Sequence, residues 1–186
     1  TLTQNKMTVQ NIYVNNETIS IDRLDLRNQL HRYLLYDAIL TNDSSIVDGK
    51  GIGDPTEFAL VEMGRKATVD ENLLRELMPR LEEIPFDSDR KLMSTKYELH
   101  DVPTVLTKGA LDVLLDRTAN IRLEDGIREI TQVDKDAILQ KNLEFSQEGL
   151  RVLAFGYKEV PEDYTLSLDN ENGFTFLGLI SMMDPP

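Results

Sequence analysis

The stretch EIPFDSDRKLMSTKYELHDVPTVLT, residues 83–107, carries the strongest signal for the fold class. Its apolar and β-branched residues gather in three short runs, which predict strands over residues 83–86, 91–99 and 104–107. Polar residues typical of turns separate these runs, at Asp87-Ser88-Asp89 and at His100-Asp101. Connections this short join antiparallel neighbours, so we expect an antiparallel sheet.

Further strands are expected on both sides of this stretch. The apolar residues of segments 7–14 and 18–21 alternate around a polar Asn15-Asn16 turn, and segments 151–157 and 174–180 are also strand-like. The strands are therefore grouped, without the regular strand–helix alternation of a parallel sheet.

Helices are expected between the strand groups. Asp54-Pro55-Thr56-Glu57 is a strong start signal, because Asp54 can cap the helix, Pro55 suits its first position and Glu57 occupies the capping-box position. The other expected helices are 22–40, 70–78 before Pro79, 109–115, and 131–147 opened by Thr131-x-x-Asp134, with a loop over 43–53. The predicted fold class is α+β, an antiparallel β-sheet flanked by helices.

Composition limits the functions available. The chain has 186 residues, enough for one domain with a sizeable core, and its formal charge of −13 argues against nucleic acid or an anionic membrane surface as partner. No apolar run approaches the roughly 20 residues needed to cross a bilayer. The chain has no Cys, and its two histidines, His31 and His100, lie far apart, so we expect no metal site.

Familiar catalytic patterns are also missing from the sequence. No Ser/His/Asp constellation can be nominated, and no Gly-rich loop ends in Lys-Ser or Lys-Thr. We therefore expect no catalytic residue in this chain, and no nucleotide binding through a P-loop.

Five segments, in this order and at this spacing, resemble the nucleotide-binding domain of P-type cation-transporting ATPases, with the calcium-pump subgroup as the nearest match. They are Thr1-Leu2-Thr3-Gln4-Asn5-Lys6-Met7-Thr8, Gly53-Asp54-Pro55-Thr56-Glu57, Phe86-Asp87-Ser88-Asp89-Arg90-Lys91-Leu92-Met93, Lys108-Gly109-Ala110, and Gly149-Leu150-Arg151 with Asp184-Pro185-Pro186. Several motifs in register are far more specific than any one of them. The resemblance implies a piece of a longer chain, a single domain over 1–186 whose ends, about 1–8 and 180–186, are hinge segments to a missing phosphorylation domain.

The resemblance also implies an ATP site. Phe86 would stack on the adenine, a contact worth roughly 1–3 kcal/mol, although by residue type alone a core position is the commoner outcome. Lys108, followed by Gly109-Ala110, would place a charge at the end of the adenine pocket where Gly allows close approach, instead of lying solvated at a strand end. Arg151 would bind the polyphosphate through its fork of donors, the alternative being an ion pair with a carboxylate.

Glu57 has two expected roles that compete for one carboxylate. It could complete the capping box at Asp54, whereas the family places this residue at the exocyclic amine of adenine, with Thr56 nearby. The resemblance further assigns Lys91 to the phosphates, and Met93 and Leu153 to the adenine slot, although each could be ordinary surface or core.

Two positions depart from the family pattern. Ser88 stands where animal calcium pumps often carry an Arg, so one phosphate contact is either missing or supplied by Arg90. Leu111 stands where a Pro commonly follows Lys-Gly-Ala, which affects only the start of the next helix.

The resemblance implies a cytoplasmic domain of an integral membrane protein, without membrane contact of its own. It would bind ATP with Mg²⁺, whose ligands lie mainly outside this chain, and present the γ-phosphate to an Asp on the phosphorylation domain; phosphorylation and actuator domains of the same chain are the expected partners. The acceptor Asp is absent here, so the fragment should not hydrolyse ATP. Calcium is the expected ion, with manganese, sodium or protons as alternatives.

Two rival functions are a degenerate regulatory or protein-interaction domain and a stand-alone phosphotransferase. The phosphotransferase is disfavoured because no acceptor residue with a supporting base is visible.

Overall fold

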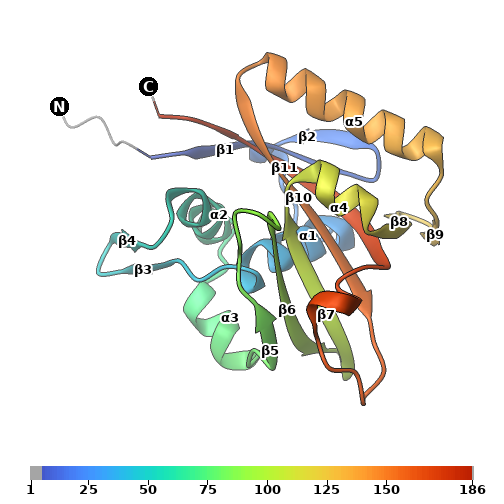
Figure 1. Ribbon diagram of the computed structural model, residues 1–186. Coiled ribbons are helices and arrows are strands. Elements are labelled where there is room, and N and C mark those ends of the chain that lie inside the picture. Colours follow the sequence, from blue (N-terminus) through green and yellow to red (C-terminus); the bar gives the residue numbers. More distant parts are fainter. Residues whose placement is uncertain (1–5, 186) are drawn as a thin grey trace.

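The computed structural model describes residues 6–185, which form a nine-stranded sheet with helices on both faces and a separate two-stranded hairpin (Figure 1). Thr1-Leu2-Thr3 of the first motif, most of the first hinge segment and Pro186 lie outside the described residues. The main path of the sheet has the order β2-β1-β11-β10-β7-β6-β5, with β8 paired to β11 and β9 to β8. Its strands are β1 (Thr8–Val14), β2 (Glu17–Ser20), β5 (Glu82–Ile84), β6 (Leu92–Leu99), β7 (Val102–Gly109), β8 (Thr118–Leu123), β9 (Gly126–Glu129), β10 (Leu150–Glu159) and β11 (Phe174–Met183).

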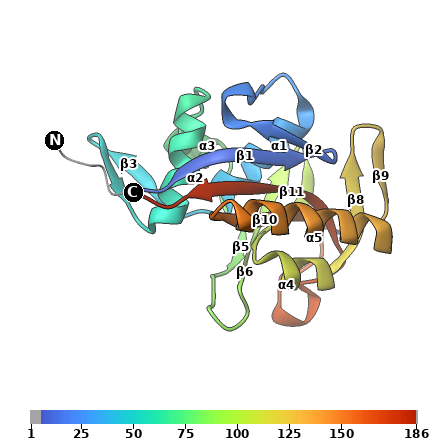
Figure 2. The same ribbon diagram turned by 90° about the horizontal axis from the view of Figure 1, so that it is seen from above.

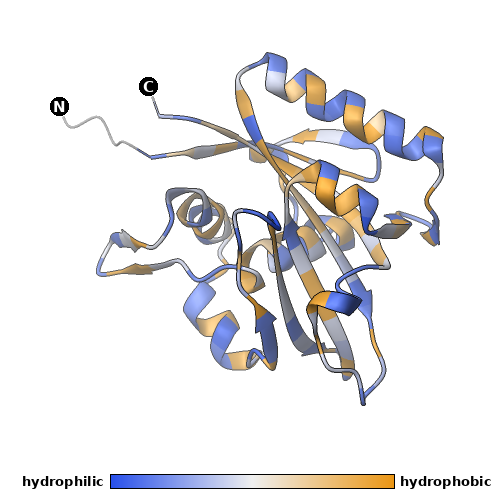
Figure 3. Cartoon of the chain, in the orientation of Figure 1, coloured by the Kyte–Doolittle hydropathy of each residue, from blue (hydrophilic) through white to orange (hydrophobic). Residues whose placement is uncertain are grey.

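The sheet separates the two main apolar cores. Helices α1 (Gln29–Leu40) and α2 (Pro55–Lys66) cover one face, and α4 (Leu111–Asp116) and α5 (Gln132–Gln147) cover the other. Figure 2 shows α1 on one side of β1 and β11, with α4 and α5 on the opposite side. Apolar residues lie along the strands and the helices packed on them, whereas the connecting turns are largely polar (Figure 3). Burial of these two faces supplies the main driving force for the fold.

The centre of the sheet confirms the expected fold class. β6 and β7 pair antiparallel from Leu92↔Gly109 to Leu99↔Val102, and β7 then pairs antiparallel with β10. The turn residues His100 and Asp101 both have positive φ, 50° and 65°, as a tight hairpin between right-twisted strands requires. The pairing of β8 with β11 is parallel.

Three helices begin where their capping residues predict. The side chain of Asp54 accepts hydrogen bonds from the N–H groups of Thr56 and Glu57, and Asp70 caps α3 (Glu71–Leu77) in the same way. Thr131 and Asp134 form a reciprocal capping box at the start of α5. These polar side chains satisfy N–H groups that have no partner inside the helix.

The expected helix over 22–40 is wrong in its first half. A short 3₁₀ turn, η1 (Ile21–Arg23), is followed by non-helical chain, and α1 begins only after Asn28, whose side-chain oxygen accepts from the N–H groups of Leu30 and His31. Leu24 and Leu26 still pack against the α1/α2 core. The two leucines are half-buried although their segment is irregular, and the sequence pattern did not distinguish them from the leucines of a helix.

Segments 43–53 and 109–115 also differ from the sequence prediction, and the strands β8 and β9 were not expected. The expected loop over 43–53 contains the hairpin β3 (Ser45–Val47) and β4 (Lys50–Ile52), turned by Asp48 and Gly49 at φ 51° and 77°. An Asp-Gly pair is a typical hairpin turn, so this signal was present in the sequence. The expected helix over 109–115 begins later, because β7 continues through Gly109 and Ala110 is the N-cap of α4. The short 3₁₀ turn η2 (Leu168–Asn170) precedes β11.

The two ends of the described chain lie side by side. β1 and β11 are antiparallel neighbours, with Thr8 opposite Met183, so both ends leave the same edge of the molecule (Figure 1). Within residues 6–185, each helix is too short or too polar to span a bilayer.

Candidate functional site

An ion pair between Glu57 and Lys108 forms the centre of the candidate site. Glu57 lies in the first turn of α2, and Lys108 is the penultimate residue of β7. The Lys108 ammonium donates to the Glu57 carboxylate at 2.5 Å, and the Asp43 N–H donates to the other carboxylate oxygen at 3.3 Å. The capping-box role expected of Glu57 is therefore not the one its carboxylate performs. The structure instead joins two residues that the sequence nominated from motifs 51 positions apart.

Lys108 is unusually buried for a lysine, with only 6% of its side chain exposed. Burial lowers its pKa because removal from water disfavours the ammonium, and Glu57 opposes this effect. The solvated-lysine alternative is wrong for this residue.

A second carboxyl acts on the same lysine. Asp37 of α1 is fully buried, and its Oδ2 has no hydrogen-bond partner among the described residues. Burial raises the pKa of Asp37 well above its ordinary value, while the charge of Lys108 and the hydroxyl of Thr41 act in the opposite direction. Nothing in the sequence distinguishes Asp37 from other helix residues, so it was not nominated.

The strand register places the nominated Met93, and also Phe155, next to Lys108. Met93 on β6 and Phe155 on β10 lie directly opposite Lys108 on its two neighbouring strands, so the three side chains share the α1/α2 face of the sheet. Leu153 lies two residues from Phe155 and packs on the same core. Met93 is 2% exposed, so it contributes an apolar floor at this position.

Phe86 lies in the loop that joins β5 to β6, and 57% of its surface is exposed. The core alternative for Phe86 is therefore wrong. The same loop ends at Lys91, which is exposed and has a positive φ of 64°. The Lys91 carbonyl accepts from the N–H of Ala110 at 3.1 Å, so this end of the loop is held against the residue that follows the strand bearing Lys108.

Gly109 has a structural reason to lack a side chain. A Cβ built on Gly109 would lie 2.1 Å from the carbonyl oxygen of Lys91, a separation that no real contact allows. The sequence predicted a close approach of the ligand at this glycine, whereas the close neighbour in the structure is the chain's own backbone at Lys91. This contact brings the Phe86 loop and the end of β7 together.

Arg151 lies on the same sheet face, opposite Met182 of β11 and close to the edge where both ends of the described chain leave the fold. It precedes Phe155 by four residues on β10, a distance of about 13 Å along the strand. The carboxyl group of Asp184 lies 2.9 Å from its Nε, and both side chains are exposed, at 63% for the arginine and 50% for the aspartate. The ion-pair alternative for Arg151 is therefore present in this structure.

Thr56 and Ala110 occupy flanking positions. Thr56 is half-buried in the first turn of α2, and its hydroxyl lies 3.5 Å from the sulfur of Met7. Ala110 is half-buried as the N-cap of α4. Both lie next to a central residue of the site, Thr56 before Glu57 and Ala110 two residues after Lys108.

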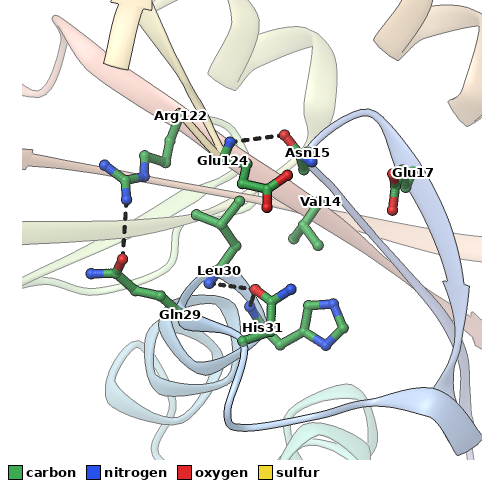
Figure 4. Close-up of a pocket in the computed structure, with 9 residues that line it drawn as sticks. Val14, Asn15, Glu17, Gln29, Leu30, His31, Arg122 and Glu124 are labelled. Atoms are coloured by element: carbon green, nitrogen blue, oxygen red, sulfur yellow. Dashed lines mark hydrogen bonds between the residues drawn. The ribbon is translucent and has the colours of Figure 1, made fainter. Parts of the chain in front are cut away.

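A polar cleft at another place on the molecule contains none of the nominated residues. It has a volume of about 410 Å³ and lies between the β1–β2 turn, the start of α1 and the end of β8 (Figure 4). Arg122 donates to Gln29 at its rim, and the Glu124 N–H donates to Asn15. Its lining carries charges of both signs, from Glu17, Arg122 and Glu124, so this cleft shows no consistent preference for a ligand.

No cluster of three or more His, Cys, Asp or Glu side chains suited to a metal ion occurs within residues 6–185. Near Lys108, the Glu57 carboxylate is engaged with that lysine and with the Asp43 N–H.

Comparison with known proteins agrees with the fold and with these motifs. A family model described as P-type ATPase, cytoplasmic domain N, matches residues 31–186. The chain belongs to the P-type ATPase family and corresponds to its cytoplasmic domain N.

Calcium-transporting ATPases are among the proteins to which this chain is similar. The chain is 43% identical to a calcium-transporting ATPase of Listeria monocytogenes, 42% to calcium-transporting ATPase 1 of Lactococcus lactis and 39% to calcium-transporting ATPase 1 of Bacillus cereus. Each match covers 100% of this chain and only 21% or 22% of the relative. The chain thus spans about a fifth of the length of these relatives.

Proposed function

We propose that this chain is the ATP-binding domain of a cation-transporting P-type ATPase and that its site lies around Lys108. The observation that carries the proposal is the buried Glu57–Lys108 pair, with the apolar Met93 opposite Lys108 and the exposed Phe86 in the adjoining loop. A carboxylate acceptor, an ammonium donor and an exposed aromatic ring are the groups that recognise an amino-substituted nucleobase.

The chain has residues that suit both the adenine end and the phosphate end of ATP. Glu57 would accept from the exocyclic amine of adenine, Phe86 would stack on the ring, and Met93 and Leu153 would supply apolar contacts. Lys91 and Arg151 are the exposed cations for the phosphates. The exposed Arg151–Asp184 pair is of the kind worth roughly 0–1 kcal/mol, so phosphate oxygens can replace Asp184 at low cost.

In the whole protein the domain would position the γ-phosphate for transfer to an Asp on a separate phosphorylation domain, and so drive ion transport, with calcium as the expected ion from the named relatives. Mg²⁺ would accompany ATP, with ligands mainly from that other domain. The paired strands β1 and β11 support segments 1–8 and 180–186 as the two hinge connections, since both ends leave the fold together. Affinity of the isolated chain should be weak, on the order of 0.1 to a few mM.

A titration of the ¹⁵N-labelled chain with ATP, with and without Mg²⁺, tests the proposal. We expect saturable NMR shifts at Glu57, Phe86 and Lys108. Phe86→Ala should weaken binding by roughly 5- to 150-fold, the equivalent of a lost stacking contact. The matched control is Leu77→Ala, because Leu77 is also an exposed apolar residue, at 72%, but lies on α3. Unchanged spectra up to several times the expected dissociation constant would refute the proposal.

A second function, a degenerate regulatory or protein-interaction domain, is favoured by one observation. The pairing of Arg151 with Asp184, together with Ser88 in place of an arginine, leaves the phosphate end with few uncommitted cations. The same titration separates the two functions, because a degenerate domain would show no response to ATP and no loss on Phe86→Ala.

A further inference from the structure

The loop over residues 85–91 carries Phe86, but the Phe86 side chain does little to hold this loop in place. More than half of this side chain is exposed, at 57%, so it buries too little surface to fix its own orientation. Stacking requires the ring to be held in place before the ligand arrives, because ordering it on binding would reduce the affinity. The contacts that hold the loop are therefore part of the site.

Local contacts shape the turn but do not attach it to the domain. The Asp87 carboxylate accepts from the N–H groups of Asp89 at 2.6 Å and Arg90 at 3.3 Å, and the Lys91 N–H donates to the Asp87 carbonyl at 2.6 Å. These bonds lie entirely within residues 87–91. They define a compact turn that is attached to β7 only at its Lys91 end, through the Ala110 N–H.

Arg90 joins the two ends of the loop to each other. Its Nη2 donates to the carbonyl oxygens of Pro85 at 3.0 Å and Leu92 at 2.7 Å, on either side of the turn. Only 13% of its side chain is exposed. The suggestion from the sequence that Arg90 replaces a phosphate contact at Ser88 does not agree with this inward position.

Glu171 then attaches Arg90 to the body of the domain. It lies just before β11, 81 residues further along the chain, and is fully buried. Its Oε1 accepts from Nε of Arg90 at 2.8 Å and from Nη1 of Arg117 at 3.3 Å, and its Oε2 accepts from the Ser94 hydroxyl at 2.5 Å. A buried carboxylate with charged partners and a hydroxyl is held in a single geometry.

From these contacts we propose that Arg90 and Glu171 are positioning residues for nucleotide binding, holding the loop so that the Phe86 ring is presented for stacking. The inference rests on the proposed ATP site. Neither residue touches the nucleotide, and both act through Phe86. Loss of the Glu171 charge would leave the buried Arg90 without its counterion, and the loop would then be attached to the sheet only at its Lys91 end.

A double-mutant cycle on the ATP dissociation constant of the full 186-residue chain tests this inference. Glu171→Gln alone should weaken ATP binding at least about 5-fold, up to the loss caused by Phe86→Ala. In the Phe86→Ala background, Glu171→Gln should change binding less than about 2-fold, because the residue it positions is already gone. A purely global effect on stability would reduce binding equally in both backgrounds.

The matched control is Glu71→Gln. Glu71 is likewise fully buried and paired with an arginine, Arg65, but it belongs to α3 and does not contact the Phe86 loop. We expect ATP binding by this variant to stay within about 2-fold of the parent. Should Glu171→Gln fail to fold, Arg90→Lys in the same cycle decides the question, since a lysine keeps the charge but cannot bridge both carbonyls and Glu171.

The possible results separate the two proposals. Binding of ATP by the parent with no loss in Glu171→Gln, or with the same loss in both backgrounds, would overturn the positioning role and leave the ATP site intact. A parent chain that does not bind ATP at all would overturn both.

Discussion

The carboxylate of Glu57 and the ammonium of Lys108 connect the first turn of α2 to the end of β7, and only 18% and 6% of the two side chains are exposed. A charge removed from water to this extent needs an opposite charge beside it, so each of the two groups depends on the other. The pair thus has two roles. It stabilises the junction of helix and sheet, and it keeps an acceptor and a donor together at the proposed adenine site.

Replacement of Glu57 by Gln should therefore cost stability as well as nucleotide affinity. Lys108 would remain buried without its direct partner, and breaking a buried pair in this way typically costs 3–5 kcal/mol; with Glu57 partly exposed, we expect about 2–3 kcal/mol in urea unfolding. Glu62→Gln is the control on the same helix, because its partner Lys6 is 34% exposed and the loss should stay below about 1 kcal/mol. Equal losses in the two variants would contradict the special role of the Lys108 pair.

Asp37→Asn should make the protein more stable at alkaline pH relative to the parent. Burial raises the pKa of Asp37 in the folded state, so the folded protein holds this proton at a pH where the unfolded chain has released it. Stability from the protonated carboxyl is complete below the ordinary value of 3.8 and is lost as pH rises through the raised pKa.

Urea unfolding of both proteins at pH 5 and pH 8 measures this effect. The parent should lose stability relative to Asp37→Asn between the two values, by on the order of 1 kcal/mol or more. Asp43→Asn is the control, since Asp43 also acts on Lys108 but is 65% exposed. A constant difference between the Asp37 variant and the parent at both pH values would show that Asp37 does not titrate in this range.

Gly109→Ala should disturb the contact between the Phe86 loop and β7. The added methyl would meet the Lys91 carbonyl, and relief of such a clash by backbone movement typically costs about 1–3 kcal/mol. We expect that loss in urea unfolding, together with altered NMR shifts at Lys91 and Ala110. Gly149→Asn is the control, because Gly149 has open space around it and a φ of 79° that Asn tolerates. Full stability of Gly109→Ala would mean that the loop moves away from β7 without cost.

Local signals predicted the helix starts and the central hairpin, because a cap or a tight turn is decided within a few residues. Asp54, Asp70 and Thr131 each satisfy N–H groups in their own first turn. The start of α1 was predicted too early, at residue 22, because a misleading local pattern precedes the true start. Asn28 is the N-cap at the true start of α1, but Leu24 and Leu26 before it, half-buried from an irregular segment, imitated helical spacing.

The site was predictable only in its parts. The resemblance nominated Glu57 and Lys108, but their ion pair depends on the packing of α2 against the sheet, which no local pattern specifies. Glu171 lies 81 residues from Arg90, and the sequence around it is that of an ordinary acidic loop. Burial, not residue type, distinguishes such residues, and burial becomes visible only once the strands are ordered.

The acid sensitivity of the fold should depend strongly on Asp134, at the start of α5. Two hydrogen bonds from Arg128, at 2.6 and 2.7 Å, hold the pKa of this carboxyl well below its usual range, and the Thr131 N–H adds a third at 2.8 Å. A lowered pKa means that the stabilisation is complete above the ordinary value of 3.8 and is lost as pH falls toward the folded-state value. Arg128 is 47% exposed, so solvent screens part of its contribution.

At pH 7, Asp134→Asn should cost about 1–2 kcal/mol in urea unfolding, as the loss of a helix cap does, and the difference from the parent should shrink below pH 4. Asp136→Asn, an exposed change on the same helix, should stay within about 0.5 kcal/mol of the parent at each pH. If Asp134→Asn and its parent differ equally at pH 7 and pH 3, the carboxylate charge is not what stabilises this helix start.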